Sequence, residues 1–308
     1  MTSIRSRIFI WLIRNRHLLQ GKLKREVVNE HFLVDKFREG VDKTSAKMGK
    51  MPQDISVEKT AVNHMYAEWI IPQNPLEGKV LLYIHGGGFI SGSCHTHRMH
   101  LAKFAQGIQL KCLLFDYRLA PEHPFPAAVE DCVTAYQWLL EKGFKPKDII
   151  VGGESAGGTL TLSLLLALKE QGLAQPNAAF SISPVTDLRC EAESFTANAK
   201  KDIAPMGSWD VWTKYYIGDH DPADPLLSPQ MGNFSGLPPL YICVGTHEIH
   251  LDDCKNMAKQ AEEHGVDVTL ALWPKMVHAF PILAPLFPEA KKALEDICAF
   301  VRNQLNSN

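Results

Sequence analysis

Short apolar runs alternate with amphipathic stretches along the chain from about residue 55 onward. Apolar runs rich in β-branched residues predict strands, and apolar positions three and four residues apart predict helices. The expected strands are residues 55–62, 64–71, 79–84, 110–116, 148–152, 178–183, 240–244 and 267–273. The expected helices are residues 127–142, 156–171, 251–264 and 288–305.

This alternation predicts the α/β class, because strands separated by helices form βαβ units with a parallel sheet. We expect a mostly parallel central sheet flanked by helices, which begins with an antiparallel pair at 55–62 and 64–71. Two regions depart from the alternation: residues 1–50 are helical and basic in pattern, and residues 187–217 are irregular and then helical. We expect both to lie over the carboxyl ends of the strands, where open α/β sheets bind ligands.

The composition is that of an ordinary globular protein, with 308 residues, 45% hydrophobic and 21% charged. The formal net charge of −2 gives no reason to expect nucleic acid as a partner. The seven cysteines are scattered and form no CxxC pair, so we expect buried free thiols and a reducing compartment, the cytoplasm. No apolar run is long enough to cross a bilayer, and we expect no stable membrane insertion.

The segment 1–25 is basic and holds no acidic residue. Its apolar run, residues 8–13, is shorter than that of a signal peptide, and no small-residue cleavage site follows, so we do not expect export. A helix fits this segment better, and its apolar side is expected to consist of Ile4, Ile8, Trp11, Leu12 and Leu19. We expect this helix to pack on its own protein as a lid; the alternative is a helix that touches a membrane surface.

The most specific motif is residues 153–157, Gly-Glu-Ser-Ala-Gly, which connects an expected strand directly to an expected helix. A GxSxG sequence in this setting is typical of a nucleophile elbow. Glycine on both sides permits a tight turn, and the N-terminus of the following helix favours developing negative charge. The motif therefore predicts Ser155 as a catalytic nucleophile, and a purely structural glycine turn is the alternative.

A second motif, His85-Gly-Gly-Gly, ends the expected strand 79–84. Three glycines in a row leave a backbone whose N–H groups can converge on the oxyanion of a tetrahedral intermediate. Because the motif lies one strand–helix unit before Ser155, we expect this function rather than a flexible loop.

A serine nucleophile needs a base, and a neutral histidine is the usual one. His278 follows the last expected strand and precedes the last expected helix, which places it at the carboxyl edge of the sheet. We therefore predict His278 as the base. Three histidines near the expected helix 251–264 are expected at the surface: His247, His250 and His264.

A metal site is not predicted. Three closely spaced histidines could suggest one, but they are expected in a loop without clustered acidic or cysteine partners: His95, His97 and His100. The acidic run 219–225 could suggest calcium, but proline-punctuated turns of this kind are usually solvated loops.

The base needs a carboxylate to orient it, and the chain order expected for this kind of site is serine, acid, histidine. Glu248 lies directly after the strand 240–244, in the loop at the carboxyl edge. Asp252 and Asp253 come about one helical turn later. We predict Glu248 as the acid, with Asp252 as the second choice.

These stretches together resemble the bacterial hormone-sensitive-lipase-like family of α/β-hydrolase carboxylesterases. The resemblance runs from about residue 77 to the end and is carried by residues 85–88, 116–122, 124–128, 153–157 and His278. It implies an α/β-hydrolase fold with a helical cap and an oxyanion hole. The hole would be formed by the amides of Gly87, Gly88 and Ala156.

The resemblance also implies supporting roles. His85 would brace the oxyanion loop, with Gly86 and Glu154 beside it, rather than act as the base. Arg118 and Glu122 would hold the loop beneath the site. The family usually has aspartate before its serine and as its acid, where this chain has Glu154 and Glu248.

By this resemblance, residues 1–50 would be the N-terminal part of the cap. Residues 51–308 would be the α/β-hydrolase catalytic domain, with a second cap segment at about 187–217. The lid interpretation of segment 1–25 then places Ile8, Trp11 and Leu12 at the acyl pocket or its rim.

The expected function is that of a serine carboxylesterase, which hydrolyses short- to medium-chain esters through an acyl-enzyme without a metal or organic cofactor. The expected partner is a small-molecule ester. A lactone hydrolase and a deacetylase remain alternatives with the same triad. A non-catalytic ligand receptor is disfavoured because His278 is present. The natural substrate and the formation of a homodimer stay open.

Overall fold

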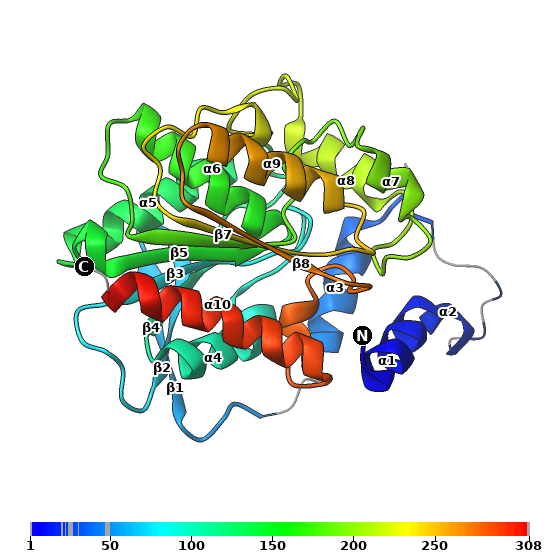
Figure 1. Ribbon diagram of the computed structural model, residues 1–308, viewed down its shortest axis with the longest axis horizontal. Helices are drawn as coiled ribbons and strands as arrows, with labels where there is room; N and C mark the ends of the chain where they lie inside the picture. The colour runs from blue at the N-terminus through cyan, green and yellow to red at the C-terminus, as the bar shows by residue number, and fades with distance from the viewer. Residues whose placement is uncertain are drawn as a thin grey trace.

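A mostly parallel eight-stranded sheet runs through the centre of the computed structural model, which describes residues 2–19, 21, 23, 27–29, 31–46 and 50–306 (Figure 1). The strands are β1 Ile55–Val62, β2 Met65–Pro72, β3 Val80–Ile84, β4 Lys111–Phe115, β5 Ile149–Glu154, β6 Ala178–Ile182, β7 Leu240–Gly245 and β8 Val268–Trp273. Their order is β1-β2-β4-β3-β5-β6-β7-β8. The β1/β2 and β2/β4 pairs are antiparallel and the others are parallel. The predicted strands and the predicted α/β fold class are therefore confirmed.

Helices cover both faces of the sheet (Figure 1). The helices are α1 Ile4–Arg14, α2 Arg16–Leu19, α3 Val34–Ser45, α4 Cys94–Ile108, α5 Ala127–Glu141, α6 Ala156–Glu170, α7 Glu193–Ala197, α8 Ser208–Ile217, α9 Leu251–Glu263 and α10 Pro288–Asn306. Three short 3₁₀ turns are η1 Pro146–Asp148, η2 Pro229–Met231 and η3 Phe280–Leu283. Helices α5, α6 and α9 pack on one face, and α4 and α10 pack on the other. No helix of the described residues combines the length and the apolarity needed to cross a membrane.

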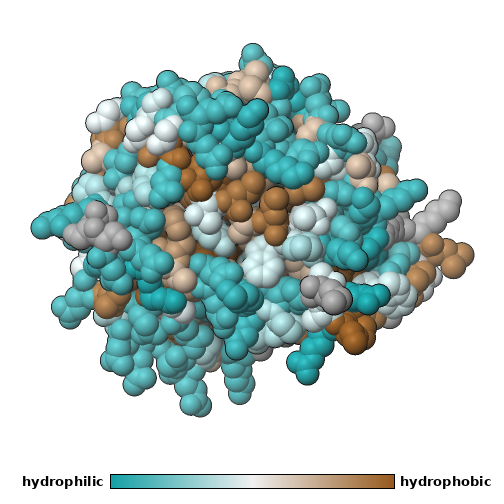
Figure 2. Space-filling view, viewed as in Figure 1, coloured by the Kyte–Doolittle hydropathy of each residue, from teal (hydrophilic) through white to brown (hydrophobic). Residues whose placement is uncertain are grey.

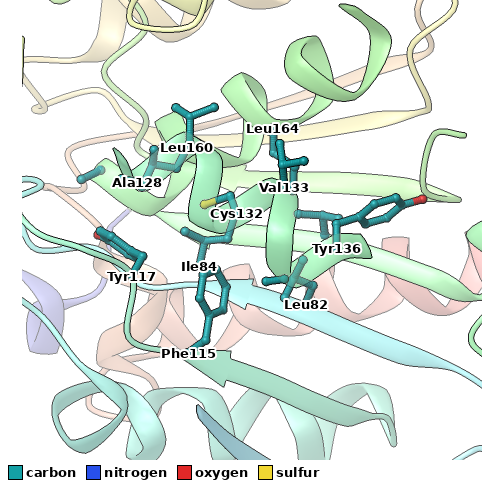
Figure 3. Packing of buried hydrophobic residues seen from close by; sticks show 14 of the residues in the cluster. Leu82, Ile84, Phe115, Tyr117, Ala128, Cys132, Val133, Tyr136, Leu160 and Leu164 are labelled. Atoms are coloured by element: carbon teal, nitrogen blue, oxygen red, sulfur yellow. The ribbon is translucent and has the colours of Figure 1, made fainter. Parts of the chain in front are cut away.

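The core alternates between the two faces with the period of a strand. On β3, Leu82 and Ile84 point into the cluster formed with α5 and α6, whereas Leu81 and Tyr83 point into the cluster formed with α4 and α10. Figure 3 shows Leu82 and Ile84 beside residues of α5 and α6. All four side chains are fully buried. Burial of this kind stabilises each position by about 1.5–3 kcal/mol, so the loops that leave these strands start from fixed points.

Helix α4 was not predicted, and the expectation of a loop around His95, His97 and His100 is wrong. A capping box starts the helix: the Ser93 side chain accepts the N–H of Thr96, and the Thr96 side chain accepts the N–H of Ser93. Apolar residues at helical spacing then pack against the sheet, among them Leu101, Phe104, Ala105 and Ile108. The polar first turn hid this periodicity in the sequence.

Helix α1 packs on α10, but not with the side that was predicted. Ser3 caps α1, and its hydroxyl donates to a Glu289 oxygen at 2.8 Å; Phe9 contacts Phe287, and Ile10 is buried. The side chains expected to face inward are exposed: Ile4 by 72%, Ile8 by 55%, Trp11 by 59% and Leu12 by 39%. Figure 2 shows apolar surface over α1 at the lower right. The spacing of apolar residues predicted the wrong buried side because polar contacts of Ser3 and Ser6 with Glu289 orient the helix. The side chain of Leu19, also expected on that side, lies outside the described residues.

Helix α3 is joined to the loops at the carboxyl ends of β3 and β4 through one arginine. Arg38 donates from Nε to the Ile90 carbonyl oxygen at 2.7 Å and forms a two-pronged pair with Glu122, also at 2.7 Å. Arg118 pairs with the buried Asp131 at 2.9 Å. Both acids hold the segment that follows β4, and Glu122 also connects it to α3.

Described residues of the segment 1–50 contact residues of the segment 187–217 at one edge of the sheet. Phe37 of α3 contacts Trp212 of α8, with 5.4 Å between ring centroids. The N–H of Val28 donates to the Met206 carbonyl oxygen at 2.8 Å. These contacts bring together two segments that are far apart in the sequence and place them over the carboxyl ends of the parallel strands.

Candidate active site

Ser155 lies at the sharp turn between β5 and α6. Its φ of 56° and ψ of −125° are unusual for a residue with a side chain and cost about 1–3 kcal/mol. The turn is held because the Ser155 N–H donates to the Ile182 carbonyl oxygen at 2.8 Å and the Ser155 carbonyl accepts the N–H of Thr159 at 3.0 Å. The surrounding strands thus hold the hydroxyl at the carboxyl edge of the sheet.

His278 reaches this hydroxyl from the loop after β8. Its Nε2 lies 2.8 Å from Ser155 Oγ. The His278 backbone N–H donates to Asp202 Oδ1 at 3.0 Å, which fixes the loop that carries the ring. The structure therefore brings the predicted nucleophile and the predicted base into hydrogen-bonding contact.

Glu248 stands behind His278, fully buried. Its Oε2 lies 3.4 Å from His278 Nδ1, a long contact for a hydrogen bond. Its Oε1 accepts the Gly245 N–H at 2.6 Å and the Ser183 hydroxyl at 2.9 Å. Two donors on one oxygen aim the other oxygen at the imidazole, the geometry of a carboxylate that orients a histidine.

Asp252, the second choice, faces elsewhere. One of its oxygens accepts the N–H of Ser194 at 3.0 Å, and the other pairs with Lys255 at 3.3 Å. Its side chain is 31% exposed. The geometry thus favours Glu248 over Asp252 as the partner of His278.

Burial and pairing act in opposite directions on the two groups. Burial alone lowers the pKa of His278, but the hydrogen bond and the negative charge of Glu248 outweigh it, so the pKa of His278 is raised. Burial also raises the pKa of Glu248, because the carboxylate loses its hydration. The pair is thus suited to holding a proton on the imidazole while negative charge stands behind it.

Gly87 and Gly88 line the same cavity as Ser155, and Ala156 directly follows Ser155 at the start of α6. Within the part of the chain that the structure describes, no acceptor receives the N–H of Gly87, Gly88 or Ala156. Gly87 and Gly88 have φ values of 126° and 64°, which L side chains rarely adopt. A Cβ on Gly88 would lie 2.4 Å from Trp212. These positions therefore need glycine, and they leave donors free for an oxyanion.

A buried group of side chains supports the loop. Glu154 Oε1 accepts the N–H of Gly86 at 2.7 Å and lies 3.1 Å from His97 Nε2. His85 Nδ1 lies 2.8 Å from the Gly86 carbonyl oxygen, and its ring stacks on Tyr117 at 4.2 Å. Burial lowers the pKa of His85 to about 3, so this ring is neutral. His85 and Glu154 thus both contact Gly86 at the start of the glycine loop.

The expectation that His250 lies at the surface is wrong. Its side chain is fully buried at the start of α9, with its ring centroid 5.0 Å from that of His278 and 4.5 Å from that of Trp209. Burial and the neighbouring His278 hold its pKa well below the usual value. The sequence could not show this because α9 carries polar residues on its exposed side, and His250 precedes its first turn.

Three polar residues near the pair were missed by sequence reasoning. Asp202 accepts the backbone N–H groups of His278 and Ile249, both at 3.0 Å. Asn198 donates from Nδ2 to the Glu248 carbonyl oxygen at 2.8 Å. Ser183, which donates to Glu248, also accepts the Ala279 N–H at 3.0 Å. Two of the three come from the segment 187–217, where irregular sequence gave no signal.

The site opens into a cavity of about 260 Å³. Its apolar walls include Phe37, Ile203, Trp209, Trp212 and Ile282. A larger cavity of about 890 Å³ adjoins it and shares Phe37 and Ile282 with it.

The prediction that Ile8, Trp11 and Leu12 lie at the acyl pocket or its rim is wrong. Among the described residues, none of α1 lines the cavity at Ser155. Ile8 and Trp11 instead border a groove beside Lys275 and Met276.

Comparison with known proteins agrees with this geometry. A family model described as "alpha/beta hydrolase fold" matches residues 81–282. An acetyl-hydrolase of Streptomyces hygroscopicus is 38% identical over 257 residues, covering 83% of this chain and 84% of that protein. An esterase of Acinetobacter venetianus (strain RAG-1) is 40% identical over 224 residues, covering 72% of this chain and 74% of that protein.

A solved structure gives the same result at the level of the fold. The crystal structure of an esterase from the bacterial hormone-sensitive lipase family superposes with a TM-score of 0.90 at 37% identity and covers 99% of both chains. The predicted fold and the predicted resemblance are thus confirmed, and the chain belongs to the α/β-hydrolase family, among the hormone-sensitive-lipase-like esterases.

Proposed function

We propose that this protein is a serine carboxylesterase in which Ser155 is the nucleophile, His278 the base and Glu248 the acid. One observation carries the assignment: the 2.8 Å contact of His278 Nε2 with Ser155 Oγ at a strained turn beside unpaired amides. The names of its relatives, esterase and acetyl-hydrolase, support the same reaction class.

The reaction follows from the positions of these groups. His278 Nε2 takes the proton of Ser155 as the oxygen attacks the ester carbonyl, and the carbonyl oxygen gains negative charge. The amides of Gly87, Gly88 and Ala156 stabilise that charge. His278 then gives its proton to the leaving alcohol, and a water molecule activated by the same ring releases the acid from Ser155. No step uses a metal or an organic cofactor.

We propose neutral esters with short to medium acyl chains as the substrate class. The cavity of about 260 Å³ has mainly apolar walls, which suits a small acyl group. We also propose that the protein acts on a small-molecule ester, binds no nucleic acid, does not insert stably into a membrane and lies in the cytoplasm. We also propose that residues 1–50 and 187–217 form the cap over a catalytic domain 51–308, although α1 contributes no wall to the cavity.

A panel of p-nitrophenyl esters from about two to sixteen acyl carbons, with several lactones, tests this proposal. We expect the highest kcat/KM at about two to six carbons and at least a tenfold decrease by about twelve, because longer chains exceed the cavity. Phe37→Ala opens the wall shared with the larger cavity and is expected to shift the optimum to longer chains. Phe9→Ala, a matched loss of a ring in α1, should leave the profile unchanged.

Equal kcat/KM across the whole range would contradict the proposed chain length. Turnover of lactones alone would replace the carboxylesterase assignment with the lactone hydrolase. Absence of any hydrolysis by a folded protein would overturn the function itself.

The dependence of kcat/KM on pH is expected to have an acidic limb with a midpoint above 6.5, the ordinary pKa of histidine, because Glu248 raises the pKa of His278. The reactive imidazole is the neutral one, so the rate rises as the pH rises through this pKa. In Glu248→Gln the charge that raises the pKa is absent, and the midpoint should move to lower pH. Measurement of kcat/KM from about pH 5 to pH 9 decides the point, and an unmoved midpoint in this variant would exclude Glu248 as the source of the shift.

A further inference from the structure

His250 is a buried polar side chain without a role in the proposed reaction. It is fully buried, and neither ring nitrogen makes a well-formed hydrogen bond within the described residues; a backbone group of Ser183 is near enough to raise its pKa slightly. Histidine nitrogens in such a position are usually satisfied, because an unpaired buried polar atom is costly. An apolar side chain would fill this place at lower cost, so the imidazole calls for a different explanation.

Two further atoms that could coordinate a metal ion lie near this ring. Glu248 Oε2 and His278 Nδ1 face each other at a long 3.4 Å and have no other partner among the described residues. Glu248, His250 and His278 each offer one ligand atom, and these three atoms all lie within 4.8 Å of one another. Ligand atoms around one tetrahedral zinc ion are about 3.4 Å apart, since each is ~2.1 Å from the metal. A shift of roughly an ångström would therefore complete the set.

The chemistry of the set selects the ion. Two imidazole nitrogens and one carboxylate oxygen suit Zn²⁺, Ni²⁺ or Cu²⁺, whereas Mg²⁺ and Ca²⁺ prefer oxygen ligands alone. Three protein ligands leave a fourth position for water. His278 itself lines the cavity at Ser155, as does Trp209, which contacts the rings of both histidines, so the ligand set borders the open site.

We propose that Glu248, His250 and His278 form a site for a divalent transition-metal ion, with Zn²⁺ as its best fit, and that the bound ion switches the esterase off. The inference rests on the proposed function, because the ion acts through the proposed base. His278 would coordinate with the lone pair of Nδ1. The proton of the neutral ring then sits on Nε2, the atom that must accept the proton of Ser155, so the hydroxyl cannot be activated. The ion also removes Glu248 from its place behind the ring.

Two readouts on the purified full chain test the site separately from the reaction. Titration calorimetry with ZnCl₂ measures binding without reference to activity, and hydrolysis of p-nitrophenyl acetate in zinc-buffered solution measures inhibition. We expect one Zn²⁺ per chain, loss of more than nine-tenths of the rate at saturation, and full recovery with EDTA. MgCl₂ at the same concentration should have no effect.

The His250→Leu variant removes one ligand and leaves the proposed reaction groups in place. Its rate without zinc should stay within about threefold of the original, and both its zinc affinity and its sensitivity to zinc should fall at least tenfold. His264→Leu, a histidine at the other end of α9, is the matched control and should bind and respond as the unchanged chain does. His250→Asn, smaller and polar, replaces His250→Leu if circular dichroism shows that the leucine variant is unfolded.

The outcomes separate the two proposals. Zinc binding with a His250-dependent affinity in a protein without esterase activity would keep the site and overturn the function. Esterase activity without zinc binding would overturn the site alone. Inhibition of equal strength in His250→Leu and in the unchanged chain would place the ion elsewhere and overturn the inference.

Discussion

Replacement of Ser155 by alanine is expected to lower kcat on a short acyl ester by about five to six orders of magnitude. Ser155 Oγ is the atom that contacts His278 Nε2, and it stands at the turn that faces the free amides of Gly87 and Gly88. Without the hydroxyl no acyl-enzyme can form, and only the weak assistance of the remaining groups to water is left. The measurement is kcat on p-nitrophenyl acetate with the purified variant.

The fold should survive this substitution. Alanine removes one oxygen from a side chain whose backbone turn is held by Ile182 and Thr159, so the melting temperature is expected to change little. Ser181→Ala, which removes another buried hydroxyl that donates to the Gly158 carbonyl oxygen, controls for the loss of a serine and should keep most of the activity. A folded Ser155→Ala protein that retained a tenth of the original rate would contradict the whole assignment.

Glu248→Gln is expected to reduce kcat about a thousand-fold or more, while Asp252→Asn should cost less than about tenfold. A carboxylate behind His278 fixes the tautomer with the proton on Nδ1 and stabilises the imidazolium that forms during attack. An amide of the same shape cannot supply that charge, and it can present its NH₂ group to the ring. Asp252 pairs with Lys255 and the Ser194 N–H, so its neutralisation leaves the imidazole untouched.

Glu248→Asp is the conservative partner of this comparison. It keeps the charge but withdraws it by one methylene from a ring nitrogen that is already 3.4 Å away. We expect activity between those of the original and the Gln variant, measured as kcat on the same ester. A larger loss in Asp252→Asn than in Glu248→Gln would transfer the role to Asp252.

The sequence allowed the central elements and the main residues of the candidate site to be predicted. Ser155 and His278 stand at the ends of strands with strong apolar patterns, and parallel topology brings such ends to one edge. Glu248 could be ranked over Asp252 for the same reason, since it directly follows β7. The local pattern determined these positions.

The cap and the support of the site could not be predicted in the same way. Asp202 and Asn198 come from an irregular segment, and their contacts with the His278 and Glu248 loops depend on how that segment lies over the sheet. The direction of α1 was decided by the Ser3–Glu289 contact, which joins the two ends of the described chain. Long-range polar contacts of this kind leave no periodic trace in a sequence.

The cavity wall divides into two parts that differ in how freely they can be altered by laboratory evolution. The glycine side tolerates almost nothing: a Cβ on Gly88 would meet Trp212 at 2.4 Å, and one on Gly157 would meet the Ile84 carbonyl oxygen at 2.1 Å. Phe37 and Ile203 come from segments outside the sheet, and their apolar side chains line the cavity without taking part in its hydrogen bonds. A saturation library at these two positions would change which esters the protein accepts, and most of its variants would still fold. A library that included the glycines would consist mostly of inactive variants.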